Sequence, residues 1–93
     1  MSTEFTMPAV LYPFVEKLTP DDRDDVLALF QAADLDRQAA HVRAAQIQAA
    51  REGRSDPQTE RAHRLIQIAE RMRKLWTNFG LDLRDAHIRR QAI

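Results

Sequence analysis

The sequence contains no cysteine. Disulfide bridges, thiolate nucleophiles and cysteine-ligated metal ions are therefore excluded. Serine occurs only at Ser2 and Ser55, and no glycine-rich phosphate-binding loop is present. We therefore expect that the protein is not an enzyme and that it holds no cofactor.

Long hydrophobic runs are also lacking. The longest apolar stretch, 7–15, contains two prolines and a tyrosine and has no basic segment before it. Such a stretch is typical neither of a membrane-spanning helix nor of a signal peptide. We expect no membrane partner and a cytoplasmic location.

Glycine is rare, with two residues in 93, and no alternating run rich in Val, Ile and Thr predicts a strand. Alanine, leucine, arginine and glutamine, which favour helices, are abundant instead. The length fits one domain, 1–93. We predict an all-α fold: a small antiparallel bundle of three main helices, with residues 1–12 as an extended arm, a short N-terminal helical turn and a C-terminal helix over 83–93.

The strongest pattern lies in 58–79, which predicts one continuous amphipathic helix. Its apolar residues recur at steps of three and four, which places them on one face. Ser55 or Asp56 can cap its start, Pro57 suits a first turn, and Gly80 suits the position after its end. The apolar face comprises Ala62, Leu65, Ile66, Ala69, Met72, Trp76 and Phe79, widened by Ile68 and Leu75.

Two further helices are expected before it. Thr19 and Pro20 predict the start of a helix over 20–33, and the aspartates of 21–25 suit the positive end of its dipole better than they suit catalysis. A break at 34–36 separates it from 37–52, although one helix over 20–52 remains an alternative. Alanine pairs recur every five residues in 37–52, so we expect this helix to be sandwiched between others, or else to be lightly packed. The loop 53–56 predicts an antiparallel hairpin with 58–79.

The charges are unevenly distributed although the net charge is zero. Residues 1–42 carry three basic and eight acidic side chains, a net −5, and 43–93 carry eleven basic and six acidic ones, a net +5. Within 58–79, Glu60–Arg64 and Glu70–Lys74 have the spacing of helical ion pairs. A chain with two oppositely charged halves can pair head-to-tail with a copy or bind an anionic partner.

Histidine supplies no convincing metal site. Glu60 and His63 have the spacing of a di-iron bundle motif, but such sites need two of these motifs and two further glutamates. His63 falls on the polar side of its helix, where we expect a solvated histidine. No metal is inferred.

The segment 75–83 resembles a helix-turn-helix unit in its pattern, with Gly80 in the turn and apolar residues on both sides. Trp76 and Arg89 are unfavourable for this interpretation, because a small and an apolar residue are expected there. A DNA-binding unit of this kind would contact nucleic acid through Arg84, His87, Arg89, Arg90 and Gln91.

The apolar face of 58–79 is the other candidate binding site. It is either the protein's own core or an interface formed by Leu65, Ile68, Met72, Leu75, Trp76 and Phe79. Tryptophan and methionine are common at binding surfaces. We predict a non-catalytic regulatory module that binds another protein, for example a transcription regulator, or itself as a homodimer. The alternative function is a small DNA-binding regulator that uses the basic C-terminal helix.

Overall fold

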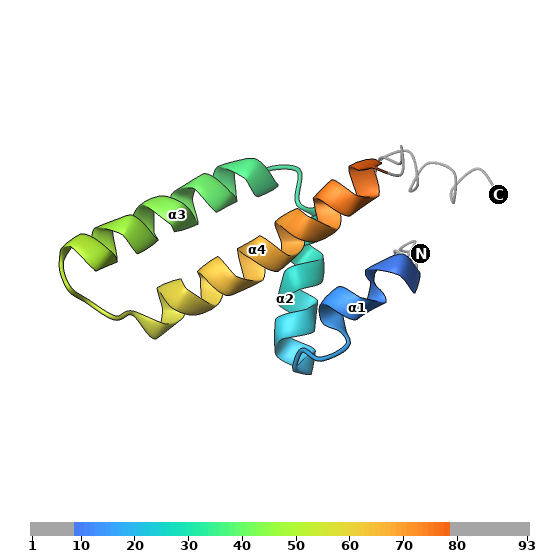
Figure 1. Cartoon of the computed structure of the whole chain (residues 1–93), viewed down its shortest axis with the longest axis horizontal. Helices are drawn as coiled ribbons and strands as arrows, with labels where there is room; N and C mark the ends of the chain where they lie inside the picture. Colours follow the sequence, from blue (N-terminus) through green and yellow to red (C-terminus); the bar gives the residue numbers. More distant parts are fainter. Residues whose placement is uncertain (1–8, 79–93) are drawn as a thin grey trace, which may run out of the picture.

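The computed structural model describes residues 9–78, and within that part of the chain all elements are helical (Figure 1). A short 3₁₀ helix, η1 (Ala9–Leu11), leads into α1 (Tyr12–Val15), and three longer helices follow: α2 (Pro20–Gln31), α3 (Leu35–Arg51) and α4 (Pro57–Asn78). α4 packs against both α2 and α3, whereas α2 and α3 contact each other far less. The prediction of a small all-α bundle is confirmed.

α4 is continuous from end to end, as its sequence pattern predicts. Asp56 caps its start: one carboxylate oxygen accepts the N–H of Gln58 at 3.1 Å, and the other accepts the Thr59 hydroxyl at 2.8 Å. Pro57 occupies the first helical position, where its missing N–H costs no hydrogen bond. The predicted last residue of the stripe, Phe79, lies outside the described residues.

The core forms where α2 crosses α4. α4 contributes five buried residues, and every other helix adds at least one buried side chain to the same cluster. Aliphatic and aromatic side chains buried in this way supply most of the free energy that holds a small domain together. The cluster consists of Leu11, Val15, Val26, Phe30, Leu35, Ala39, Leu65, Ile66, Ala69, Met72 and Trp76.

The chain breaks between α2 and α3, so the alternative of one helix over 20–52 is wrong. Arg73 of α4 binds the end of α2: its Nε lies 3.1 Å from the carbonyl oxygen of Phe30, and its Nη2 lies 3.0 Å from that of Ala32. The last carbonyls of a helix have no partner within the helix, and a guanidinium can satisfy several of them at once. Asp34 stands at the cap position of α3, but its carboxylate caps no backbone N–H. It accepts hydrogen bonds from the side chains of Gln38 and Arg37 instead.

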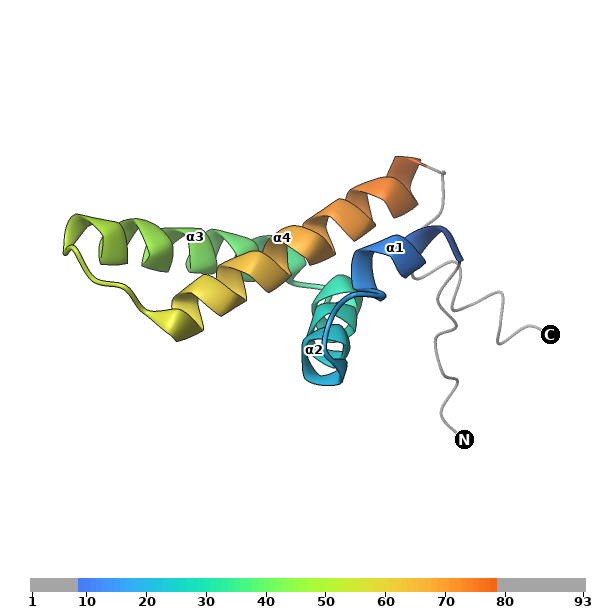
Figure 2. The ribbon, with the colours of Figure 1, turned by 60° about the horizontal axis from the view of Figure 1, so that its bottom comes forward.

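Gly53 ends α3 and starts the turn into α4. Its φ is +65°. Its N–H donates to the carbonyl oxygen of Ala50 at 3.1 Å, and the N–H of Arg54 donates to the carbonyl oxygen of Ala49 at 2.9 Å. This pair of hydrogen bonds is a Schellman motif, which favours glycine because the backbone is left-handed there. The predicted antiparallel hairpin is confirmed, and Figures 1 and 2 show its loop end projecting away from α1 and α2.

Two local predictions, the sandwiched position of 37–52 and the extended arm over 9–12, are wrong. α3 is not sandwiched: Leu35, Ala39 and Ala49 are buried, but Ile47 is 54% exposed, because α2 turns across α4 and leaves the outer side of α3 uncovered. The arm is not extended over 9–12, because the turns of η1 and α1 bury Leu11 completely.

The predicted ion pairs within α4 are also replaced by other contacts. Glu70 binds Arg43 of α3 at 2.5 Å instead of Lys74, and Glu60 accepts the Ser55 hydroxyl at 3.1 Å instead of pairing with Arg64. Glu70 and Glu60 therefore contact groups on the neighbouring helix and in the loop 53–56, and not the residues four positions later in α4. The predicted helix over 83–93 lies outside the described residues.

Candidate functional site

The residues predicted as an interface on α4 face the interior of the described chain. Leu65, Met72 and Trp76 are buried in the core, and Ile68 and Leu75 are half-buried against it. Phe79 lies outside the described residues. Most of the stripe therefore packs against α2 and α3 of the same chain, and its members Ala62, Leu65 and Ile66 also line a groove on the surface.

The residues predicted to contact nucleic acid lie outside residues 9–78. These are Arg84, His87, Arg89, Arg90 and Gln91. Of the proposed helix-turn-helix unit, the described part ends at Asn78, before the glycine of the turn. The alternative function therefore stays a prediction.

A groove of about 320 Å³ opens between α2, α3 and α4. Buried Leu65 and Ile66 form its floor, and half-buried Leu29 and Val42 stand on opposite walls. Polar groups occur at its rim. The remaining lining residues are Asp25, Ala28, Gln38, Arg61 and Ala62.

Small side chains and helix directions explain why the groove exists. Ala28 of α2 and Ala62 of α4 fill little of the space between their helices, and α2 and α3 run apart after the turn that joins them (Figures 1 and 2). No described helix covers the space between α2 and α3 above α4. The apolar walls therefore remain accessible from one side.

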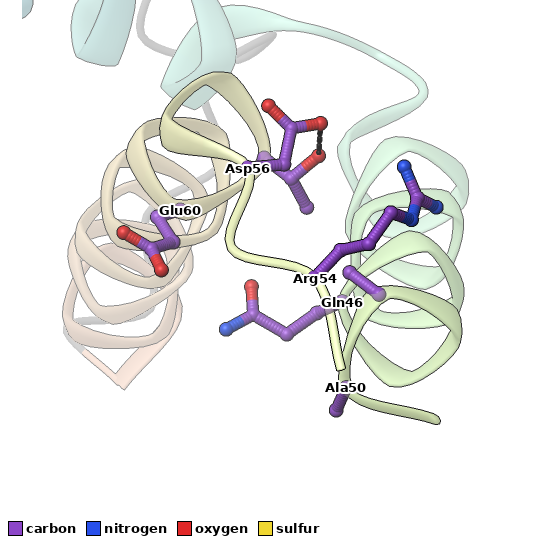
Figure 3. Close-up of a pocket in the computed structure, with 7 residues that line it drawn as sticks. Gln46, Ala50, Arg54, Asp56 and Glu60 are labelled. Atoms are coloured by element: carbon purple, nitrogen blue, oxygen red, sulfur yellow. Dashed lines mark hydrogen bonds between the residues drawn. The ribbon is translucent and has the colours of Figure 1, made fainter. Parts of the chain in front are cut away.

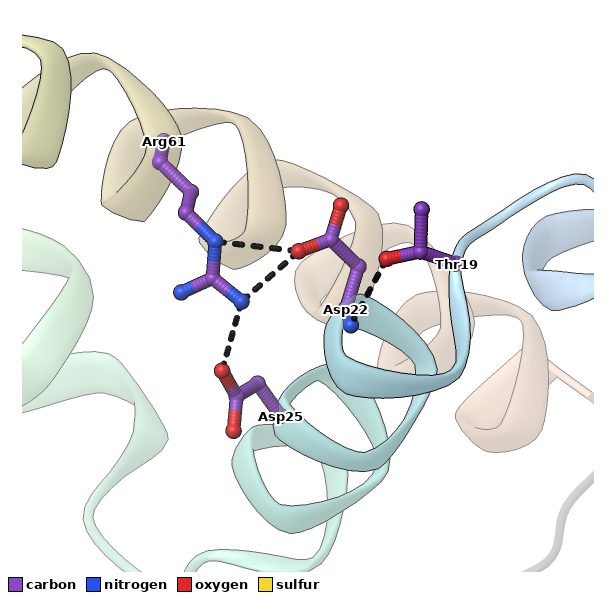
Figure 4. A network of polar contacts seen from close by, with 4 residues as sticks. All are labelled: Thr19, Asp22, Asp25 and Arg61. Atoms are coloured by element: carbon purple, nitrogen blue, oxygen red, sulfur yellow. Dashed lines mark hydrogen bonds and ion pairs between the residues drawn. The ribbon is translucent and has the colours of Figure 1, made fainter.

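Arg61 crosses from α4 to α2 at the rim of the groove (Figure 4). Its Nε lies 2.9 Å from an oxygen of Asp22, and its Nη2 lies 2.7 Å from an oxygen of Asp25. Hydrogen bonds with Asp25 first, and then with Asp22, raise the pKa of Arg61 above its ordinary value. Thr19 accepts the N–H of Asp22 at 3.2 Å and fixes the start of α2. The network holds the α2 wall against α4.

A second, smaller hollow of about 180 Å³ lies near the loop end of the hairpin (Figure 3). Gln46 reaches from α3 into the space between the two helices, and its amide oxygen is buried without a hydrogen-bond partner in the described residues. The Nδ1 atom of His63 is likewise buried and lacks a hydrogen-bond partner there, so the prediction of a solvated histidine is wrong for this atom. Gln46 is half-buried, and most of the residues that line this hollow are polar or charged, unlike those of the groove.

No known protein family, curated protein or solved structure matches this chain. Within residues 9–78, the acidic and histidine side chains form no group of three or more that could hold a metal ion. Among the same residues, no helix combines the length and the apolar character needed to cross a membrane.

Sequence reasoning found the floor of the groove but missed its walls. Leu65 and Ile66 belong to the stripe of α4, whose period is visible in the sequence. Ala28 and Arg61 carry no such signal, since their role depends on the angle at which α2 crosses α4. The break at 34–36 is the one sequence feature that makes this divergence possible.

Proposed function

We propose that this protein is a non-catalytic regulatory module that binds another protein by receiving one of its helices in the groove between α2, α3 and α4. The observation that carries the proposal is the groove itself, with apolar walls formed by Leu29 and Val42 and a floor of buried core residues. Amphipathic helices bind in grooves of this type through apolar side chains spaced three or four residues apart.

The size of the groove agrees with this mode of binding. A cavity of about 150 Å³ holds one benzene-sized group. A groove of about 320 Å³ therefore accepts roughly two large apolar side chains. Two such anchors, on successive turns of a bound helix, match the spacing of helix-in-groove recognition.

The test fills the groove without disturbing the core. Ala28 lines the groove and is exposed, so Ala28→Trp occupies the binding space from the wall of α2. Ala44→Trp is the matched control, because Ala44 is an exposed alanine of α3 outside the groove. Partners are captured from the native host with the full chain and each variant, and the captured protein is then purified and its affinity measured by calorimetry.

We expect Ala28→Trp to weaken partner binding at least tenfold and Ala44→Trp to leave it unchanged, with both variants as helical as the original by circular dichroism. Equal binding by both variants would show that the groove is not the binding site. Light scattering on the same samples measures self-association, and a dimer lost only in Ala28→Trp would identify a second copy as the ligand.

A further inference from the structure

The charge beside the groove indicates what kind of helix it receives. The first two turns of α2 carry four aspartates and one arginine, and Arg61 of α4 reaches the same surface. Four carboxylates and two guanidinium groups leave a net charge of −2. The four aspartates are Asp21, Asp22, Asp24 and Asp25.

Half of these carboxylates already have a cation. Asp22 and Asp25 share the guanidinium of Arg61. Asp21 and Asp24 are exposed and make no ion pair with any of residues 9–78. The helix dipole favours negative charge in the first turn, which accounts for Asp21, but its effect falls off before Asp24.

The unpaired carboxylates are continuous with the wall of the groove. On a helix, residues three or four apart are neighbours on the surface. Asp21 therefore adjoins Asp24 and Asp25, and both of these adjoin Ala28, which lines the groove. One side of α2 thus presents carboxylates in its first half and apolar side chains in its second half.

We propose that the helix bound in the groove is a basic amphipathic helix of a partner protein, and this inference rests on the proposed function. Its apolar side chains lie between Leu29 and Val42 on the floor formed by Leu65 and Ile66. Its lysine or arginine side chains, at the end that passes the start of α2, pair with Asp21 and Asp24. Charge complementarity of this kind selects the partner and accelerates association.

Two synthetic peptides of about 15 residues, long enough to form helix on binding, test the proposal. They share one apolar face of leucine and alanine, and their polar positions carry lysine in one peptide and glutamate in the other. Each carries a fluorescent label, and binding to the full-length chain is followed by anisotropy. Amide chemical shifts of residues 25–66 locate the bound peptide.

We expect the lysine peptide to bind at the groove and the glutamate peptide to bind at least tenfold more weakly. The variant with Asp21→Asn and Asp24→Asn should weaken the lysine peptide about tenfold and abolish most of its salt dependence. Asp36→Asn, an exposed aspartate at the start of α3 that does not line the groove, is the matched control and should have no such effect.

The outcomes separate this inference from the proposed function. In one outcome Ala28→Trp blocks the native partner, but the two peptides bind alike or the aspartate variant binds the lysine peptide as tightly as the original chain does. The groove is then a binding site, and the basic-helix proposal is wrong. If Ala28→Trp affects neither the native partner nor the peptides, both proposals are wrong. A self-association that Ala28→Trp abolishes would also overturn the basic-helix proposal, because a second copy would then occupy the groove.

Discussion

The rings of Phe30 and Trp76 meet edge to face, with their centroids 5.9 Å apart and their planes at 79°. This contact joins the last turn of α2 to the last turn of α4, although the two residues lie far apart in the sequence. Aromatic pairs in this arrangement stabilise a fold beyond the effect of their buried area. The pair holds the end of α2 against the end of α4.

Trp76→Ala should destabilise the fold by about 3–5 kcal/mol, because it removes a large buried side chain and leaves a cavity beside Phe30. Urea unfolding followed by circular dichroism measures this loss. The exposed residue Ile47 provides the control, since Ile47→Ala should change the free energy of unfolding by no more than about 0.5 kcal/mol. A Trp76→Ala variant as stable as the original would show that Trp76 is not part of the core.

Arg73→Ala should lower the free energy of unfolding by about 1.5–3 kcal/mol, the range for hydrogen bonds to a charged group. The change removes the donors to the carbonyls of Phe30 and Ala32 at the end of α2. Arg73→Lys should recover only part of the loss, since an ammonium group lacks the planar fork that reaches both carbonyls. Arg71→Ala, at an exposed position of the same helix, is the control. Equal stabilities of the Arg71 and Arg73 variants in urea unfolding would contradict this prediction.

The stability of the protein should decrease in acid partly because of Asp56. The hydrogen bond from Thr59 holds the pKa of the Asp56 carboxyl below its ordinary value. An aspartate in an unfolded chain titrates near pH 3.9, so this carboxylate stabilises the folded state fully above that pH. Its contribution disappears as the pH falls through the lower pKa of the folded state.

Asp56→Asn keeps a side chain that can cap the helix but removes this titration. The free energy of unfolding of Asp56→Asn should therefore depend less on pH below about 4 than that of the original chain. Thr59→Val, which removes the donor, should raise the pKa of Asp56 in an NMR titration. Identical pH profiles for Asp56→Asn and the original protein would show that Asp56 is not linked to stability.

Gly53→Ala should destabilise the hairpin by about 1–2 kcal/mol, the cost of a left-handed backbone for a residue with a Cβ atom. The cost is purely conformational, because a Cβ atom at this position would meet nothing within 4 Å. Gly53→Asn should cost less, since asparagine adopts this conformation more readily. Thermal unfolding of both variants measures the difference, and a Gly53→Asn variant less stable than Gly53→Ala would contradict it.

The sequence was sufficient to predict the elements whose causes are local. The stripe of α4, the cap at Thr19, a cap at Ser55 or Asp56, and the loop over 53–56 depend on neighbours within a few residues. Each of these predictions is confirmed among the described residues. The break at 34–36 was predicted from two aspartates, although it is Arg73, far away in the sequence, that binds the end of α2.

Features that depend on how helices cross could not be predicted in the same way. The alanines of 37–52 suggested close neighbours on two sides, but the number of neighbours is set by where α2 lies. Arg43 pairs with Glu70, and Arg61 with Asp22 and Asp25, across distances in sequence that no local spacing reveals. The walls of the groove belong to the same class, since Ala28 and Val42 come from helices that contact each other far less than each contacts α4.

The short connection at Gly53 also has a consequence for the order of folding. Helices α3 and α4 are neighbours in sequence, so their pairing closes a short loop and loses little chain entropy, whereas α2 must reach α4 past the whole of α3. We expect the hairpin to form in the transition state and α2 to dock after it. Stopped-flow kinetics should then give Ala39→Gly a φ-value near 1 and Val26→Ala one near 0, and the reverse order would show that α2 nucleates folding. In such a mechanism the groove is the last part of the molecule to take shape, and a helix bound there would slow unfolding without changing the rate at which the hairpin forms.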